Sequence, residues 1–402
     1  MLRRSQSIRG IVLAASASGL AVALSACTPP MPPDVLAAQA EQHFTCYQAA
    51  QPAMAPGWMA SVIDALNTGL MGLCPQQGVT AAADGTPASF ALLGQAPTDA
   101  DTKAFAAAAC SAGKVVYAPA FAYGVGLAVN GPGMETVTLT PEAIAGILSG
   151  TVTSWSDPVF AKGNEGMDLS SLGDITVVSL KDPDGAVAAM TAYLAKAAPG
   201  AWTSGVTGTL KAGTQVATTD DLLTALSDAP GSVAVLPTSV ALGASLAVPA
   251  LAVNGTAMDP TNAQQLAIGA GATTLTVDAQ GNIAAAPALG GVPNADTFDA
   301  AAAKIVLPSG EAMVGWPVQG YAHMLACDNG TDHLPMSTFL YDVTLNGQGA
   351  IAGTGNTPLP EPIRIKARTL AVQHNPSPTA VPSDGTVPAT DAPSGAASPA
   401  SS

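Results

Sequence analysis

Lys114-Val-Val-Tyr-Ala118 and Gly126-Leu-Ala-Val-Asn130 are two short apolar segments, and each predicts a buried strand. Thr140-Pro-Glu142 then predicts the start of a helix, because it supplies a hydroxyl N-cap, a proline at the first helical position and an acid in the first turn. We expect this helix to end at Gly150. Its apolar face consists of Ala143, Ile144, Ile147 and Leu148.

The same alternation continues along the chain. Asp174-Ile-Thr-Val-Val-Ser179 predicts a strand, followed by a glycine-containing loop and a helix through Met190, Tyr193 and Leu194. Thr218-Thr-Asp-Asp221 resembles a capping box, and Ser232-Val-Ala-Val-Leu236 predicts another short buried strand. Strands that alternate with helices indicate an α/β fold with largely parallel sheets.

The N-terminus has the pattern of an export signal. Residues 1–26 combine arginines, an apolar run and the small-residue end Leu24-Ser25-Ala26, and Cys27 follows directly. This end resembles the lipobox of bacterial lipoproteins, which implies that Cys27 is lipidated and anchors the protein to the outer face of the cell membrane. The alternative is an ordinary signal peptide followed by an incidental cysteine.

The composition restricts the partners. The 402-residue chain has a net charge of −15, and only ten of its 13 Lys and Arg residues follow Cys27. Such a surface repels nucleic acid and anionic lipid headgroups. The length is typical of two domains. We expect a Pro-rich tether over residues 27–36 and a disordered Pro/Ser/Ala-rich tail over 373–402.

Four cysteines remain for disulfides in an exported protein: Cys46, Cys74, Cys110 and Cys327. Four cysteines allow three connectivities, and we expect two disulfides, with a weak preference for pairing the sequence neighbours Cys46 and Cys74. The sequence contains no Cys-x-x-Cys pair, so it does not predict a metal site of that kind.

A series of landmarks resembles the phosphate-binding proteins of ABC importers. The most specific is Thr153-Ser-Trp-Ser-Asp-Pro158, within Leu148–Pro158. The others, in family order, are Pro119–Gly124, Gly126–Gly133, Ile175–Val178, Pro230–Val235, Gly315–Val318 and Asn356–Pro360. The resemblance implies a type II periplasmic-binding-protein fold, with two α/β lobes, a ligand cleft and two crossover segments. It places lobe one in residues 37–118 and 306–372, and lobe two in residues 119–305.

The phosphate contacts of that family do not carry over. Where the family has Arg, Ser, Gly and Thr at the lobe-two site, this chain has Leu180, Asp184, Gly185 and Ala186. In lobe one, Gln95 stands at the position of the family's Asp, and the Thr-Phe loop has no recognisable counterpart around His43–Cys46. We expect orthophosphate to bind weakly, unless Lys181 replaces the missing Arg.

The functional expectation is a monomeric solute receptor for phosphate or another small ligand, with an ABC permease as its partner. The alternative is a surface lipoprotein, acting as a scaffold or accessory protein, that keeps the fold without binding phosphate. The sequence has no G-x-S-x-G, H-E-x-x-H or P-loop spacing, so we expect no enzyme activity, no cofactor and no metal. Trp155 and His323 are interpreted as structural residues.

Overall fold

The computed structural model describes residues 46–82, 88–110, 114–298, 314–330 and 334–374. All of these belong to one compact unit. The predicted signal peptide, the lipidation site Cys27, the tether over 27–36 and most of the tail lie outside the described residues. Within the described part of the chain, no helix has both the length and the apolar character that a membrane span requires.

A six-stranded sheet forms the centre of the fold, in the order β2-β1-β3-β13-β4-β8. The first three in space are the parallel strands β2 (Gly78–Ala81), β1 (Ala50–Met54) and β3 (Phe90–Leu93). Strand β13 (Gln319–Asp328) pairs antiparallel with β3 and with β4, and β8 (Val233–Pro237) pairs antiparallel with the far end of β4. The chain has the predicted α/β fold, but the expectation of largely parallel sheets is wrong for this sheet, because β13 and β8 join it as antiparallel strands.

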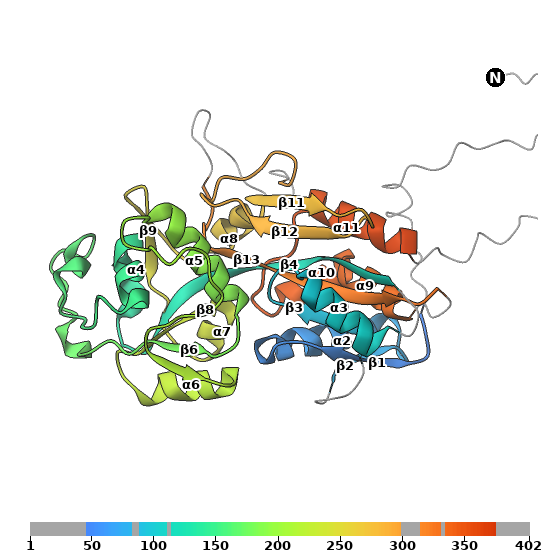
Figure 1. Ribbon diagram of the computed structural model, residues 1–402, viewed down its shortest axis with the longest axis horizontal. Coiled ribbons are helices and arrows are strands. Elements are labelled where there is room, and N and C mark those ends of the chain that lie inside the picture. The colour runs from blue at the N-terminus through green and yellow to red at the C-terminus, as the bar shows by residue number, and fades with distance from the viewer. Residues whose placement is uncertain (1–45, 83–87, 111–113, 299–313, 331–333, 375–402) are drawn as a thin grey trace, which may run out of the picture. The chain divides into compact units, whose positions relative to one another are not determined.

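Strand β4 (Lys114–Val129) is one continuous strand of 16 residues, where the sequence predicted two separate ones. It pairs with β13 as far as Gly124 and with β8 from Val125 onward, so it crosses from lobe one into lobe two (Figure 1). The second crossover leads into β13, where the Val318 carbonyl accepts a hydrogen bond from the Val125 N–H at 2.9 Å. These two crossovers join the two lobes of a type II periplasmic-binding-protein fold.

Pro119 explains why the middle of β4 does not resemble a strand in sequence. In the register with β13, Pro119 lies opposite His323 and Phe121 lies opposite Ala322, so Ala120 forms a local irregularity. Proline has no N–H to donate to a sheet and is tolerated at such irregularities. The strand continues beyond this point because nearly every residue in it is buried.

Lobe one surrounds the sheet with helices on both faces. Leu325 and Cys327 of β13 share an apolar cluster with Phe105 of α3 (Asp99–Ala109), whereas Met324 and Ala326 point into the main core. That main core contains residues of α2 (Ala60–Leu73), α9 (Leu334–Asp342), α10 (Leu345–Ala352) and α11 (Glu361–His374). Side chains of successive strand residues point to opposite faces, which places these helices on both sides of the sheet.

Two elements within the range expected for lobe two pack instead against β4 and β13. They are helix α8 (Ala263–Ala270) and the hairpin of β11 (Thr273–Val277) and β12 (Ile283–Pro287). Asn282 in the hairpin turn accepts a hydrogen bond from the Tyr117 N–H of β4 at 3.0 Å. At the other end, α11 continues to His374, so residues 373 and 374 are helical.

Lobe two contains the helix that Thr140, Pro141 and Glu142 predicted. Helix α4 spans Pro141–Ser149; the Thr140 hydroxyl accepts a hydrogen bond from the Ala143 N–H at 3.1 Å, and Gly150 ends the helix at a φ of 77°. Both ends of this prediction are confirmed. The other elements are β5 (Thr138–Leu139), β6 (Val178–Leu180), α5 (Gly185–Ala197), β7 (Thr214–Val216), α6 (Thr219–Asp228), α7 (Thr238–Gly243), β9 (Ala250–Val253) and β10 (Thr256–Met258).

Strand β6 is shorter than the predicted segment 174–179. It covers only Val178–Leu180, although Val177 forms a parallel bridge to Val233 of β8. Asp174 forms only an isolated bridge with Ser154. The predicted segment therefore begins before the residues that have a neighbouring strand to pair with.

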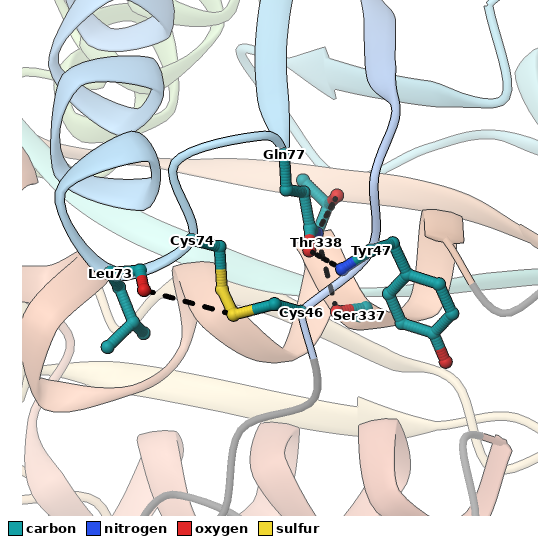
Figure 2. Close-up of a disulfide and its surroundings, with 7 residues drawn as sticks. All are labelled: Cys46, Tyr47, Leu73, Cys74, Gln77, Ser337 and Thr338. Atoms are coloured by element: carbon teal, nitrogen blue, oxygen red, sulfur yellow. Dashed lines mark hydrogen bonds between the residues drawn. A yellow bond between two sulfur atoms is a disulfide. The ribbon is translucent and has the colours of Figure 1, made fainter. Parts of the chain in front are cut away.

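Both expected disulfides are present. Cys46 pairs with Cys74, and Cys110 pairs with Cys327, each with a Cα–Cα distance of 5.4 Å. Figure 2 shows the first pair beside a chain of polar contacts from Tyr47 to α9. The Tyr47 N–H donates to Gln77 Oε1 at 2.8 Å, and Gln77 Nε2 donates to the Ser337 hydroxyl at 3.3 Å. The disulfide and these hydrogen bonds hold the first described residues against lobe one.

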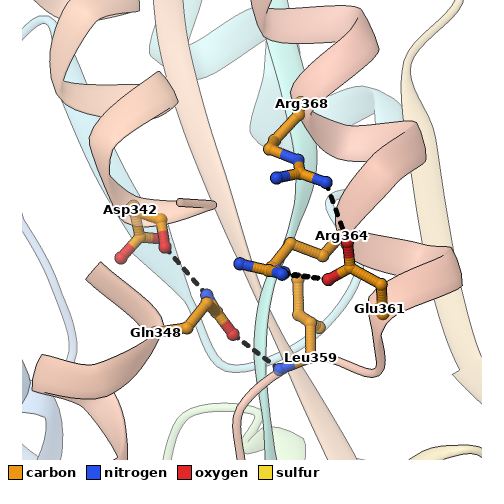
Figure 3. A network of polar contacts seen from close by, with 6 residues as sticks. All are labelled: Asp342, Gln348, Leu359, Glu361, Arg364 and Arg368. Atoms are coloured by element: carbon orange, nitrogen blue, oxygen red, sulfur yellow. Dashed lines mark hydrogen bonds and ion pairs between the residues drawn. The ribbon is translucent and has the colours of Figure 1, made fainter. Parts of the chain in front are cut away.

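Two further sets of polar contacts lie near α9, α10 and α11 (Figure 3). Gln348 Nε2 donates to the Asp342 carbonyl at 2.8 Å, and its Oε1 accepts from the Leu359 N–H at 2.6 Å. Arg364 and Arg368 both pair with Glu361 on α11. Asp342 is 1% exposed, and its carboxyl oxygens have no hydrogen-bond partner among the described residues. This burial raises the pKa of the Asp342 carboxyl well above its usual range.

Candidate functional site

The lobe-one side of the candidate site follows two neighbouring parallel strands. Strand β1 ends at Met54 and leads into a 3₁₀ turn at Gly57–Met59, which carries Trp58. Strand β3 ends at Leu93 and leads into Gly94 and Gln95. Because parallel strands end at the same edge of a sheet, these two loops meet, and an added Cβ at Gly94 would lie 3.3 Å from the Trp58 ring.

The first loop of the site lies later in the chain than expected from the sequence. The sequence comparison placed this loop around His43–Cys46, whereas the first described strand is Ala50–Met54. The loop after it therefore carries Gly57 and Trp58. His43, Phe44 and Thr45 lie outside the described residues.

The lobe-two side is the N-terminus of α5. The Asp184 side chain caps this helix, accepting hydrogen bonds from the Ala186 N–H at 2.5 Å and the Val187 N–H at 3.3 Å. Burial raises the pKa of the Asp184 carboxyl, and the two backbone hydrogen bonds partly counteract that increase. Two of the donors that this helix terminus could offer to an anion are thus already bonded to a carboxylate of the protein.

The two sides meet directly. The Tyr123 hydroxyl donates a hydrogen bond to the Gly94 carbonyl oxygen, and the Tyr123 ring lies 5.0 Å from the Trp58 ring at an interplanar angle of 59°. Gly185 lies against the same carbonyl, because a Cβ added there would come closer than 3.0 Å to it. Burial, and to a smaller extent the charge of Asp184, raise the pKa of Tyr123.

Of the predicted site residues, Asp184 and Gly185 lie where the lobes meet. The other two of the lobe-two set pack inward: Ala186 is 1% exposed in the main core, and Leu180 packs against the cluster that α6 and β8 share. Lys181 is exposed, and its N–H donates to the Val216 carbonyl at 2.9 Å. Gln95 directly follows Gly94, at the lobe-one edge.

Sequence reasoning missed Trp58 and Tyr123. Tyr123 lies in a long apolar strand, and Trp58 precedes a helix in a segment without any polar motif. The signal that could have identified them is their aromatic character, because only 4% of the chain is aromatic. Tyrosine and tryptophan join a large apolar surface to a hydrogen-bonding tip, which suits a partly wet contact.

His323 is a buried strand residue with both ring nitrogens bonded. Its Nε2 lies 2.9 Å from the Ala285 N–H and can only accept there, so Nδ1 carries the proton and donates to the Tyr321 carbonyl at 3.0 Å. Burial lowers the pKa of His323 to about 4. The imidazole is therefore neutral near pH 7, and its contact with Ala285 attaches the β11–β12 hairpin to β13.

Trp155 is likewise structural. It is 1% exposed, its Nε1 donates to the Gly231 carbonyl at 2.9 Å, and its ring lies 5.0 Å from that of Phe160. Among the described residues, no three His, Cys, Asp or Glu side chains come together as metal ligands. The site at the lobe contact consists of one carboxylate, two aromatic rings and backbone groups.

Comparisons with known proteins agree with this fold. The family model described as a PBP superfamily domain matches residues 75–289, more than half of the chain. No curated protein shows significant similarity to the sequence. Three solved structures share the fold, each over 80% of this chain and 93% of its own length.

The first of these structures is a high affinity periplasmic phosphate-binding protein bound with phosphate, at 17% identity and a TM-score of 0.55. The others are a DING protein and a human phosphate binding apolipoprotein, both at 18% identity and a TM-score of 0.53. Structural similarity at such a low sequence identity shows that the fold is shared. Together with the family match, it shows that this chain belongs to the PBP superfamily.

Proposed function

We propose that this protein is the extracytoplasmic solute receptor of an ABC importer, anchored to the outer face of a bacterial membrane through lipid on Cys27. The PBP superfamily domain, the type II fold and the two disulfides support this assignment, because disulfides persist in oxidising compartments. The ligand would lie between the lobes, and the protein would act by binding rather than by catalysis. A permease would be its membrane partner.

We further propose that the receptor does not bind orthophosphate in the manner of the phosphate-binding proteins. The observation that carries this is the Asp184 cap, which occupies the Ala186 and Val187 N–H groups. A dianion placed there would face a carboxylate, at a cost of about 1–4 kcal/mol for unit charges near 4 Å. Leu180 and Ala186 offer no polar group in place of the family's Arg and Thr, and both pack inward.

Calorimetry with phosphate at neutral pH tests this proposal. We expect no binding at micromolar phosphate. Micromolar or tighter binding that Lys181→Ala abolishes would contradict the proposal, because it would mean that Lys181 swings into the cleft. A panel of uncharged and cationic small solutes, measured in the same way, would then identify the ligand class.

One observation favours a second function. Gly94 and Gly185 contact each other and Tyr123 bonds to Gly94, so protein groups fill the space where the proposed ligand would lie. A surface lipoprotein that serves as a scaffold would keep such a contact permanently. Neighbouring permease and ATPase genes would favour the receptor, and their absence would favour the scaffold.

A further inference from the structure

A cavity of about 430 Å³ lies away from the lobe contact, mostly among elements of lobe two. It is bordered by the N-terminus of α4, the last turns of α5, the β9–β10 turn and the segments around Leu289 and Pro317. Neither Gly94 nor Asp184 nor Gly185 lines it. Its volume falls within the range of about 300–1,000 Å³ that is typical of small-molecule pockets.

The net charge of the residues that line this cavity is positive, whereas that of the whole chain is negative. Lys162 and Lys196 both line it, against a single acid, Glu142. These are two of only ten cations after Cys27, in a chain with a net charge of −15. Two ammonium groups bordering one cavity create a local positive potential that attracts anions and repels cations.

One of the two lysines is held in place. The Lys196 ammonium donates a hydrogen bond to the Leu289 carbonyl at the edge of the cavity. This contact joins α5 to the segment that returns toward lobe one. An ammonium has three N–H donors, so two remain for a ligand.

Tyr193 adds a hydroxyl group to the lining of the cavity. Tyr193 is 5% exposed and lines the cavity, and within the described ranges its hydroxyl has no hydrogen-bond partner. Burial, together with the negative charge of Glu142, raises the pKa of Tyr193 to about 12, so the phenol keeps its proton and can donate.

We propose that this cavity binds a small organic anion with carboxylate or phosphate oxygens, held by Lys162, Lys196 and the Tyr193 hydroxyl. Asn254 adds an amide at the β9–β10 turn, and Pro141, Val253 and Pro317 contact the carbon skeleton of the ligand. The site is separate from the lobe contact, so it does not depend on which solute the receptor binds there.

Calorimetric titration of the purified protein with succinate and with glycerol phosphate tests this site and distinguishes the two oxygen chemistries. We expect at least one of them to bind, and Lys162→Gln and Lys196→Gln each to weaken binding by about tenfold to hundredfold, the effect of losing a charge-assisted hydrogen bond. Glu142→Gln should strengthen binding, because it removes a like charge.

Two control variants complete the test. Lys211→Gln, at a lysine that does not line the cavity, should leave the affinity unchanged. Asp64→Asn, a charge change at an exposed residue of α2, should do the same. The proposal is overturned if neither anion binds at millimolar concentration, or if the affinity is the same in both lysine variants as in the parent protein.

Discussion

The hydroxyl of Tyr123 donates a hydrogen bond to the carbonyl oxygen of Gly94, and Gly185 lies against that same carbonyl. Tyr123 belongs to the strand that crosses between the lobes, and Gly185 begins a lobe-two helix. A single backbone carbonyl of lobe one therefore contacts both. The fit depends on the absence of a side chain at Gly185.

Gly185→Ala should weaken this contact. The new Cβ would come closer than 3.0 Å to the Gly94 carbonyl, which is backbone and cannot turn aside as a flexible side chain could. We expect a loss of stability of about 1–3 kcal/mol, the usual cost of overpacking. Thermal unfolding measures the loss, and small-angle scattering should show a larger radius of gyration if the lobes separate.

Gly72→Ala is the matched control for Gly185→Ala. Gly72 also lies in a helix, but a Cβ added there meets nothing within 4 Å. Alanine should stabilise the protein at that position, by about 0.5–1 kcal/mol. Equal effects of the two substitutions would show that Gly185 does not limit the approach of the lobes.

The protonation of His323 should make stability increase with pH. Its pKa is lowered to about 4 in the native state, so between pH 4 and its ordinary value of 6.5 the unfolded chain binds the proton more tightly. Relative to His323→Gln, the free energy of unfolding should rise by roughly 3 kcal/mol across this interval. Urea unfolding of both proteins at pH 4, 5, 6 and 7 measures the difference. A constant difference would contradict the expectation.

Asp342 should act in the opposite direction. Burial raises its pKa in the native state, so the native state holds the proton more tightly than the unfolded chain does. Protonated Asp342 therefore contributes to the stability of the native state. This contribution is fully present at a pH below the pKa of the unfolded chain, and it is lost as the pH rises through the pKa of the native state. Asp342→Asn should therefore stabilise the protein at pH 7 by at least about 1 kcal/mol, the equivalent of one pKa unit, and by less at pH 4, because asparagine is neutral at both pH values.

The control for Asp342 is Asp64→Asn, at an exposed position on α2. We expect that change to alter stability by no more than about 0.5 kcal/mol. If Asp342→Asn instead destabilised the protein at neutral pH, this prediction would be wrong. The carboxyl group would then stabilise the native state, although no described residue bonds to its oxygens.

Removal of the two disulfides should have unequal effects. Cys110 and Cys327 are 217 residues apart, and Cys46 and Cys74 only 28. In the chain-entropy account, the cross-link over the longer loop contributes about 2 kcal/mol more. Denaturant unfolding of the two Cys→Ser double variants measures this difference. Four free thiols in the unfolded, non-reduced protein would contradict both disulfides.

Local chemistry made part of the fold predictable. Thr140, Pro141 and Gly150 identified both ends of α4, because caps depend on residues that are neighbours in sequence. β4 was predicted as two strands, because the irregularity at Pro119 is stabilised by β13, about 200 residues later. β6 was predicted too long, because its extent depends on β7 and β8.

The candidate site was less predictable than the fold. The resemblance located Asp184 and Gly185, because they begin a helix that the sequence marks clearly. Trp58 and Tyr123 contact each other only after the crossover strand passes the loop that follows β1, and no spacing in the sequence records this. Ala186 lies in the main core and Leu180 packs, partly buried, against a second cluster, since the direction of a side chain depends on the tertiary fold.

Asp184→Ser should increase the affinity for phosphate. Serine is also a good N-cap, so α5 should keep its start while its N-terminal donors lose their competing carboxylate. Removing the like charge is worth about 1–4 kcal/mol, so calorimetry should show phosphate binding at least about fivefold tighter than in the parent protein. Asp182→Ser, at an exposed acid of the same loop, should have a smaller effect.

The difference in phosphate affinity between the parent protein and Asp184→Ser should also depend on pH. Because the pKa of Asp184 is raised, acidification should neutralise this carboxylate in the parent protein and make the two affinities more similar. Equal affinities at every pH would mean that Asp184 does not block an anion at this helix.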